Sequence, residues 1–67
     1  MRFSQRLREL MSDYNASAEE IADYMGIPKK SVGMYASGTH TPSLYRLLSL
    51  ADFFGLTVSE LLEGVDE

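Results

Sequence analysis

The sequence divides into short segments of helical periodicity, and a residue that ends helices stands after each one. Apolar residues recur three or four positions apart, as on one face of an α-helix, and no stretch alternates with a period of two. Glycine readily adopts the left-handed backbone conformation that ends helices, and asparagine tolerates it. The residues that close the segments are Asn15, Gly26, Gly38, Gly55 and Gly64. The pattern predicts an all-α fold of short helices.

Together with these stops, capping signals predict five helices within a single compact domain, residues 1–67. Ser17 and Thr57 are each followed three residues later by a glutamate, the capping-box pattern that satisfies free amides at a helix start. Pro28 suits a first helical turn, where no amide donor is needed. We expect helices over about 2–13, 18–25, 28–37, 43–54 and 58–63. Residues 65–67 are expected to fray.

The same spacing assigns an inward face to the helix expected over 43–54. Its predicted core stripe is Leu44, Leu47, Leu48, Ala51 and Phe54. Leu48 is at the centre of this stripe, so Leu48→Ala is expected to cost about 2–5 kcal/mol of stability. The residues that fall off the stripe are Tyr45, Ser49, Asp52 and Phe53.

Length and composition exclude several classes of function. A chain of 67 residues buries a small core, which argues against a deep, walled active site. It has no cysteine and one histidine, His40, so neither a thiolate site nor a histidine-based metal site is expected. No Ser-His-Asp set and no phosphate-binding loop is present. We therefore expect no enzyme, no cofactor and no metal.

No segment of the sequence suits a membrane. The longest nearly apolar stretch, residues 44–50, is far shorter than the roughly 20 residues that span a bilayer. The first ten residues lack the apolar region of a signal peptide. We expect a cytoplasmic protein with no membrane partner, and residues 1–67 leave no room for an effector-sensing domain.

Gly26 and Ile27 form a tight connection between the second and third expected helices. Two short helices joined across such a turn form a helix-turn-helix, although small helical bundles also contain short turns. The wider sequence decides between these readings. From Phe3 to about Gly64 it resembles the lambda-repressor/Cro-like (XRE-type) helix-turn-helix family. The matching pieces are Ala22 with Gly26, Ser37-Gly38, Pro42-Ser43-Leu44, Leu48, Ala51-Asp52 and residues 55–62.

The resemblance implies a five-helix domain whose third helix, residues 28–37, enters the major groove of double-stranded DNA. It implies a sequence-specific transcriptional regulator, a repressor or Cro-like protein, that binds as a homodimer. The family uses its C-terminal helices for dimerisation, so Phe53 and Leu56 are candidate dimer contacts. The alternative for Phe53 is that the short fifth helix covers it.

Several positions depart from the family pattern. Ala18 stands where the family usually has a glutamine that contacts DNA. Gly33 and Met34 stand where many members carry serine and a basic residue, and Ala36 replaces a common glutamate. These departures favour an alternative function: a protein-interaction module on the same scaffold, antirepressor-like or antitoxin-like, with a protein partner and weakened DNA binding.

The third expected helix turns Val32 and Tyr35 inward, which leaves the opposite face for DNA. Lys29 and Lys30 suit phosphates or guanine edges, or form a solvated face. Met34 suits a thymine methyl group or fills a gap in the packing. The candidate DNA-binding residues on this helix are Lys29, Lys30, Ser31, Gly33, Met34 and Ser37.

Other candidates lie at helix starts and in the loop after residue 38. Free amides at a helix start attract phosphates, although a serine there can equally act only as a cap. Arg46 suits a phosphate or a carboxylate partner. The candidates outside the third helix are Ser17, Thr39, His40, Thr41, Ser43 and Arg46.

The net charge of −4 conceals an uneven distribution. Residues 24–51 carry Lys29, Lys30 and Arg46 and no acidic residue, whereas residues 13–23 hold four acids and residues 52–67 hold five. The acid-free stretch spans the expected recognition helix and the loop after it. The acidic total therefore does not exclude DNA, but three cations per chain imply a modest electrostatic affinity that a dimer would strengthen.

Overall fold

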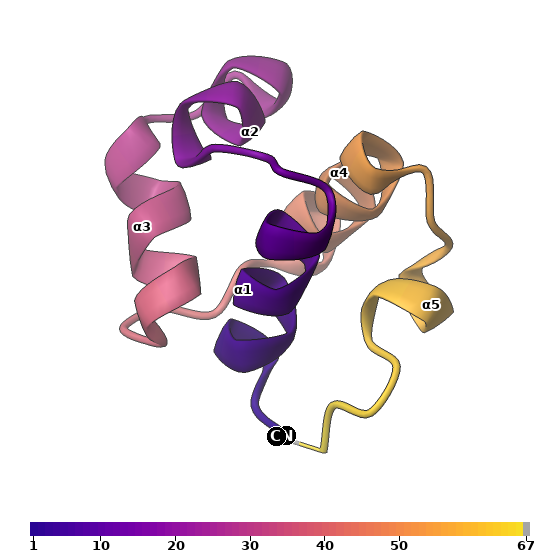
Figure 1. Cartoon of the computed structure of the whole chain (residues 1–67). Coiled ribbons are helices and arrows are strands. Elements are labelled where there is room, and N and C mark those ends of the chain that lie inside the picture. Colours follow the sequence, from indigo (N-terminus) through magenta and orange to yellow (C-terminus); the bar gives the residue numbers. More distant parts are fainter. Residues whose placement is uncertain (67) are drawn as a thin grey trace.

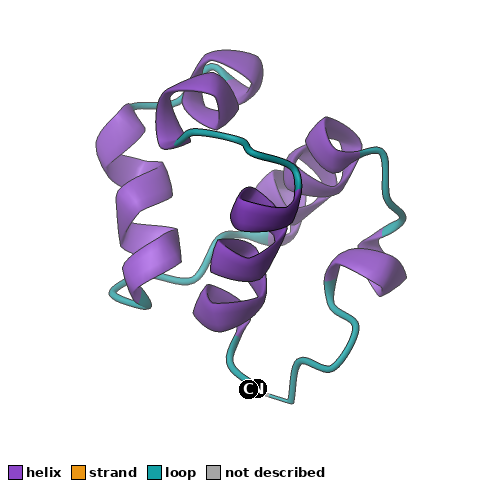
Figure 2. Cartoon of the chain, viewed as in Figure 1, coloured by secondary structure: helices purple, strands orange, loops and turns teal. Residues whose placement is uncertain are grey.

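The computed structural model describes residues 1–66, and over this range the chain forms five α-helices and no β-strand (Figures 1 and 2). The helices are α1 (Phe3–Asp13), α2 (Ala18–Met25), α3 (Lys29–Ser37), α4 (Leu44–Phe54) and α5 (Val58–Leu61). The predicted all-α fold is confirmed, and the first four helices lie within one residue of the expected bounds. α5 ends two residues early because the chain tightens there: the Glu63 amide donates to the Glu60 carbonyl, three residues back.

Cap chemistry sets the ends of the helices. Both predicted capping boxes form, at Ser17 for α2 and at Thr57 for α5. Gly38 ends α3 at φ +85°, a left-handed conformation that strains other residues. Pro28 is the N-cap of α3, with extended backbone (φ −63°, ψ 142°), and not its first helical residue as predicted.

The core lies where all five helices meet. α1 is central in Figure 1, with α3 on one side, α5 on the other, and α4 behind it. Each helix contributes one fully enclosed side chain, namely Leu7, Ile21, Val32, Leu50 and Leu61. The contacts of α2 with α3 and of α1 with α3 fix the orientation of α3, the expected recognition helix.

The core face of α4 differs from the predicted stripe. Leu50 is fully enclosed, whereas Leu44 and Leu48 are 68% and 52% exposed. The prediction that Leu44 and Leu48 belong to the core is therefore wrong. Apolar residues surround most of this helix, so their spacing is compatible with more than one inward face. Packing against α2 and α5 selects the face that carries Leu50, Ala51 and Phe54.

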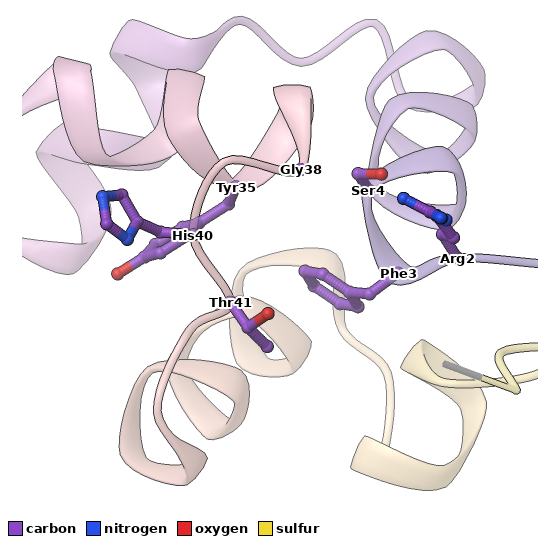
Figure 3. A pocket seen from close by; sticks show the side chains of 7 residues that line it. All are labelled: Arg2, Phe3, Ser4, Tyr35, Gly38, His40 and Thr41. Atoms are coloured by element: carbon purple, nitrogen blue, oxygen red, sulfur yellow. The ribbon is translucent and has the colours of Figure 1, made fainter.

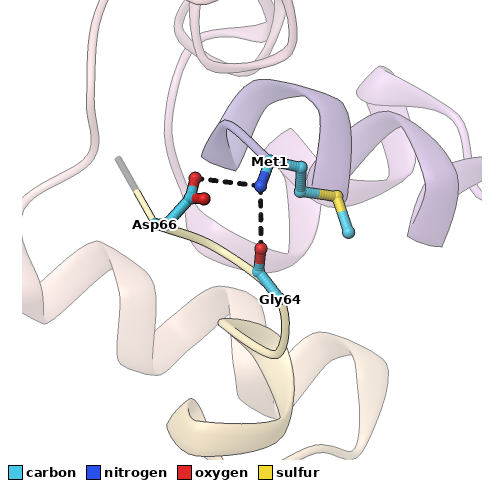
Figure 4. A network of polar contacts seen from close by, with 3 residues as sticks. All are labelled: Met1, Gly64 and Asp66. Carbon is cyan, nitrogen blue, oxygen red and sulfur yellow. Dashed lines mark hydrogen bonds and ion pairs between the residues drawn. The ribbon is translucent and has the colours of Figure 1, made fainter.

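The two ends of the described chain are joined (Figure 4). The amino group of Met1 donates to the Gly64 carbonyl and pairs with Asp66 Oδ1, each at 2.9 Å. The hydrogen bond and the positive charge of this amino group hold the pKa of Asp66 below its usual value. The expected fraying is therefore wrong for Val65 and Asp66, and Glu67 lies outside the described residues.

Candidate nucleic-acid interface

The outward face of α3 is open to solvent over its whole length. Val32 and Tyr35 are buried as predicted, and the opposite face is formed by the exposed Lys29, Lys30, Gly33 and Ser37 with the half-buried Ser31 and Met34. No neighbouring atom lies within 4 Å of the place that a Cβ at Gly33 would take. No side chain therefore projects from the middle of this face, and no neighbouring group covers it.

Positive charge gathers at the start of α3. Pro28 provides no side-chain cap, the first turn contains no acidic residue, and Lys29 and Lys30 occupy that turn. The positive end of the helix dipole lies at the same place, so two ammonium groups there are electrostatically unfavourable for the free helix. An anion bound at this end would relieve the repulsion and accept hydrogen bonds from the uncapped amides.

At the start of α2, by contrast, the capping box already places a carboxylate. Ser17 Oγ accepts from the Glu20 amide at 3.0 Å, and Glu20 Oε1 accepts from the Ser17 amide at 2.9 Å. These hydrogen bonds with Ser17 lower the pKa of Glu20, which is therefore charged at neutral pH. A phosphate near Ser17 would meet this negative charge, so Ser17 is the weakest of the candidate residues.

The loop after α3 is held close to the end of that helix. Ser37 Oγ donates to the Met34 carbonyl at 3.2 Å and lies 2.8 Å from Thr39 Oγ1. The backbone amides of Thr39 and His40 both donate to the same carbonyl, at 3.0 and 3.3 Å. This arrangement leaves the side chains of Thr39, His40 and Thr41 exposed beside α3.

Arg46 is positioned by α3 although it belongs to α4. Its Nη1 donates to the hydroxyl of Tyr35 at 2.6 Å, and its backbone amide donates to Ser43 Oγ at 3.3 Å. Within residues 1–66 no carboxylate forms an ion pair with Arg46, and its binding to a phosphate or to a carboxylate stays a prediction. The Tyr35 hydroxyl carries no charge, so this hydrogen bond does not neutralise Arg46.

A cavity of about 240 Å³ lies between the start of α1 and the loop after α3 (Figure 3). In Figure 3, Arg2 and Ser4 face His40 and Thr41 across it. The lining residues are Arg2, Phe3, Ser4, Tyr35, Gly38, His40 and Thr41. Sequence reasoning did not place Arg2 or Ser4 near the candidate site, because no local pattern reveals a contact between segments so far apart in the chain.

The N-terminal arginines have structural partners that the sequence did not reveal either. Arg8 Nη1 donates to the Ala36 carbonyl in the last turn of α3 at 2.5 Å. Arg6 donates to the carbonyls of Leu61 and Glu60 at 3.0 and 2.7 Å, at the end of α5. Cations at helix C-termini satisfy free carbonyls and the negative end of the dipole. These two charges therefore stabilise the scaffold on either side of α1.

The candidate dimer residues Phe53 and Leu56 are both half-buried. The Phe53 ring meets the rings of Tyr24 and Phe54 edge-on, with centroids 5.4 and 5.0 Å apart. Tyr24 in turn donates a hydrogen bond from its hydroxyl to Asp52, which raises the pKa of Tyr24. Tyr24 of α2 therefore packs against part of Phe53, a contact that neither predicted alternative included, and both alternatives stay predictions.

Residues 1–66 contain neither a membrane-spanning helix nor a cluster of metal ligands. No helix there has the length and apolar character needed to cross a bilayer. Nowhere in that range do three histidine or acidic side chains come close enough together to hold a metal ion.

A sequence profile described as helix-turn-helix matches residues 6–61, from within α1 to the end of α5. The chain belongs to this helix-turn-helix family. The resemblance noted in the sequence is thereby confirmed, and α2 and α3 are its helix-turn-helix. The named relatives below are transcriptional regulators, in agreement with the expectation that the chain is not an enzyme.

Named relatives are consistent with this assignment. The HTH-type transcriptional regulator AnsR of Bacillus subtilis is 46% identical over 57 residues, which are 85% of this chain and 49% of AnsR. The cryptic phage CTXphi transcriptional repressor RstR of Vibrio cholerae is 33% identical over 60 residues, which are 90% of this chain and 54% of RstR. The chain thus spans about half the length of these relatives.

A solved structure shows the same fold. The transcriptional regulator from Listeria innocua superposes with a TM-score of 0.83 at 29% sequence identity. The superposition covers 98% of this chain and 62% of that protein. Nearly all of this helix-turn-helix chain therefore has the fold of that regulator.

Proposed function

We propose that this helix-turn-helix chain is a transcriptional regulator that binds double-stranded DNA as a homodimer, with α3 in the major groove, and acts as a repressor or Cro-like protein. One observation carries the proposal most: two lysines and uncapped amides share the start of α3, where the free helix is electrostatically strained. The polyanionic backbone of DNA supplies the missing negative charge. Residues 1–67 form one domain in this proposal, and the protein acts in the cytoplasm.

The candidate DNA-binding residues have distinct roles in this proposal. Lys29 and Lys30 bind phosphates or guanine edges, and Arg46, held by Tyr35, binds a phosphate. Met34 contacts a thymine methyl group. Polar contacts with the backbone come from Ser31, Ser37, Thr39, His40, Thr41 and Ser43.

A binding titration with DNA from the promoter of the chain's own gene tests this function. We expect tighter binding to that DNA than to unrelated duplexes of the same length. Lys30→Ala should weaken both, while Glu63→Ala, which truncates an exposed side chain just after α5, should leave both unchanged. In Figure 1, α5 lies on the opposite side of α1 from α3. Failure to bind any duplex at low salt would rule out the proposal.

A protein-interaction module on the same scaffold is the second candidate. The capping carboxylate at the start of α2 favours it, because Glu20 lies near the place where Ala18 already lacks a DNA-contacting side chain. Co-purification of a stable protein partner, together with unchanged activity of Lys30→Glu in cells, would support this alternative. Loss of regulation in that variant would support DNA binding.

A further inference from the structure

The outward side of α4 carries apolar side chains that the core does not use. Leu44, Tyr45 and Leu48 are 68%, 79% and 52% exposed, and we call them the α4 face. They lie within about one turn of each other on the side of the helix opposite Leu50 and Phe54. Contiguous exposed apolar side chains of this kind mark contact surfaces in small domains.

Charge is arranged in a fixed order along the same helix. The first turn of α4 has the positive end of the dipole, with Arg46 just inside it and no acidic residue. One turn beyond Leu48 stands the exposed Asp52, whose carboxylate is oriented by the hydroxyl of Tyr24. The α4 face therefore has a positive end before it and a negative side chain after it.

This order is self-complementary when two copies of the helix run antiparallel. When a two-fold axis relates two antiparallel helices, a residue before the axis lies opposite the residue that is equally far after the axis in the other copy. With the axis at Leu48, Leu44 lies four positions before the axis and Asp52 lies four positions after it. Asp52 of each copy then lies beside the first turn of α4 in the other copy, while the apolar side chains meet in the middle.

We propose that the α4 face is the homodimer interface of this protein, on which a second copy packs its own α4 antiparallel around a two-fold axis near Leu48. The inference deepens the proposed function by naming its dimer surface in place of Phe53 and Leu56. Leu44 directly follows Ser43, so the contact brings the two candidate DNA interfaces next to each other.

The size of the α4 face sets the expected strength of the dimer. Three side chains per copy bury less than the roughly 800 Å² per partner of a standard interface. We therefore expect a dissociation constant of about 10 μM or higher without DNA. Sedimentation equilibrium up to about 1 mM protein covers this range.

The first test compares Leu48→Asp with Gln5→Asp, which adds the same charge at an exposed position of α1. Because the two-fold axis doubles each change, Leu48→Asp should raise the dimer dissociation constant at least about 100-fold. Gln5→Asp should leave that constant unchanged. A wild-type chain that stays monomeric throughout, or a Leu48→Asp dimer of wild-type strength, would overturn the interface.

The second test uses the absence of native cysteine. Oxidation should cross-link Leu48→Cys rapidly, because the axis brings the two thiols together, while Glu9→Cys should react slowly. Preferential cross-linking of Leu56→Cys would overturn the α4 face in favour of the other dimer surface. If the protein binds DNA but does not dimerise through the α4 face, only the proposed interface is refuted. If it dimerises through the α4 face but binds no DNA, only the proposed function is refuted.

Discussion

Gly33 leaves the middle of the exposed face of α3 without a side chain. Glycine inside a helix is less stable than alanine by roughly 0.5–1 kcal/mol, and the space for a methyl group here is empty. Gly33→Ala should therefore raise the free energy of unfolding by about that amount. Urea denaturation measures it, and a loss of stability would show that the position is not open.

Leu50 and Leu48 lie two residues apart on α4 but face opposite environments. Leu50→Ala should lower the free energy of unfolding by about 2–5 kcal/mol because it leaves a cavity in the core. Leu48→Ala should cost less than about 1 kcal/mol, since its side chain is half exposed. Denaturation at concentrations where the chain is monomeric compares the two; equal losses would contradict the α4 orientation.

The lysines at the start of α3 favour the proposed DNA binding but lower the stability of the free protein. Lys30→Glu places a negative charge at the positive end of α3, so the free protein should gain about 0.3–1 kcal/mol of stability. The same variant should lose DNA affinity because a phosphate contact becomes repulsive. Thermal melts and DNA titrations of one preparation measure both. Reduced stability would mean that the lysines at this helix start carry no electrostatic strain.

The helices were predictable because their signals are local. Capping boxes, glycine stops and apolar spacing act within a few residues, and they placed α1 to α4 within one residue. The inward face of α4 was not predictable, since Leu44, Leu47, Leu48 and Leu50 are all apolar and only packing chooses among them. The hydrogen bond from Arg46 to Tyr35 and the contacts of Arg6 and Arg8 depend on tertiary contacts that no local pattern encodes.

The molecule is closed by the contact of its first residue with Asp66. The pKa of Asp66 is lowered in the folded chain, so this group stabilises the fold above its unfolded pKa. That stability disappears as the pH falls through the lowered pKa. The melting temperature of Asp66→Asn should thus lie below wild type at neutral pH and converge with it in acid. A difference that does not change with pH would contradict the ion pair.

In the proposed function, DNA binding depends on a small set of cations. If Lys29, Lys30 and Arg46 each bind a phosphate, as proposed, one copy makes three phosphate contacts and a dimer makes twice that number. Each contact contributes about −0.9 to the slope of log K against log salt concentration, so fluorescence anisotropy over a salt series should give a slope of about −5. A slope near zero, or no binding at the lowest salt, would contradict the central claim.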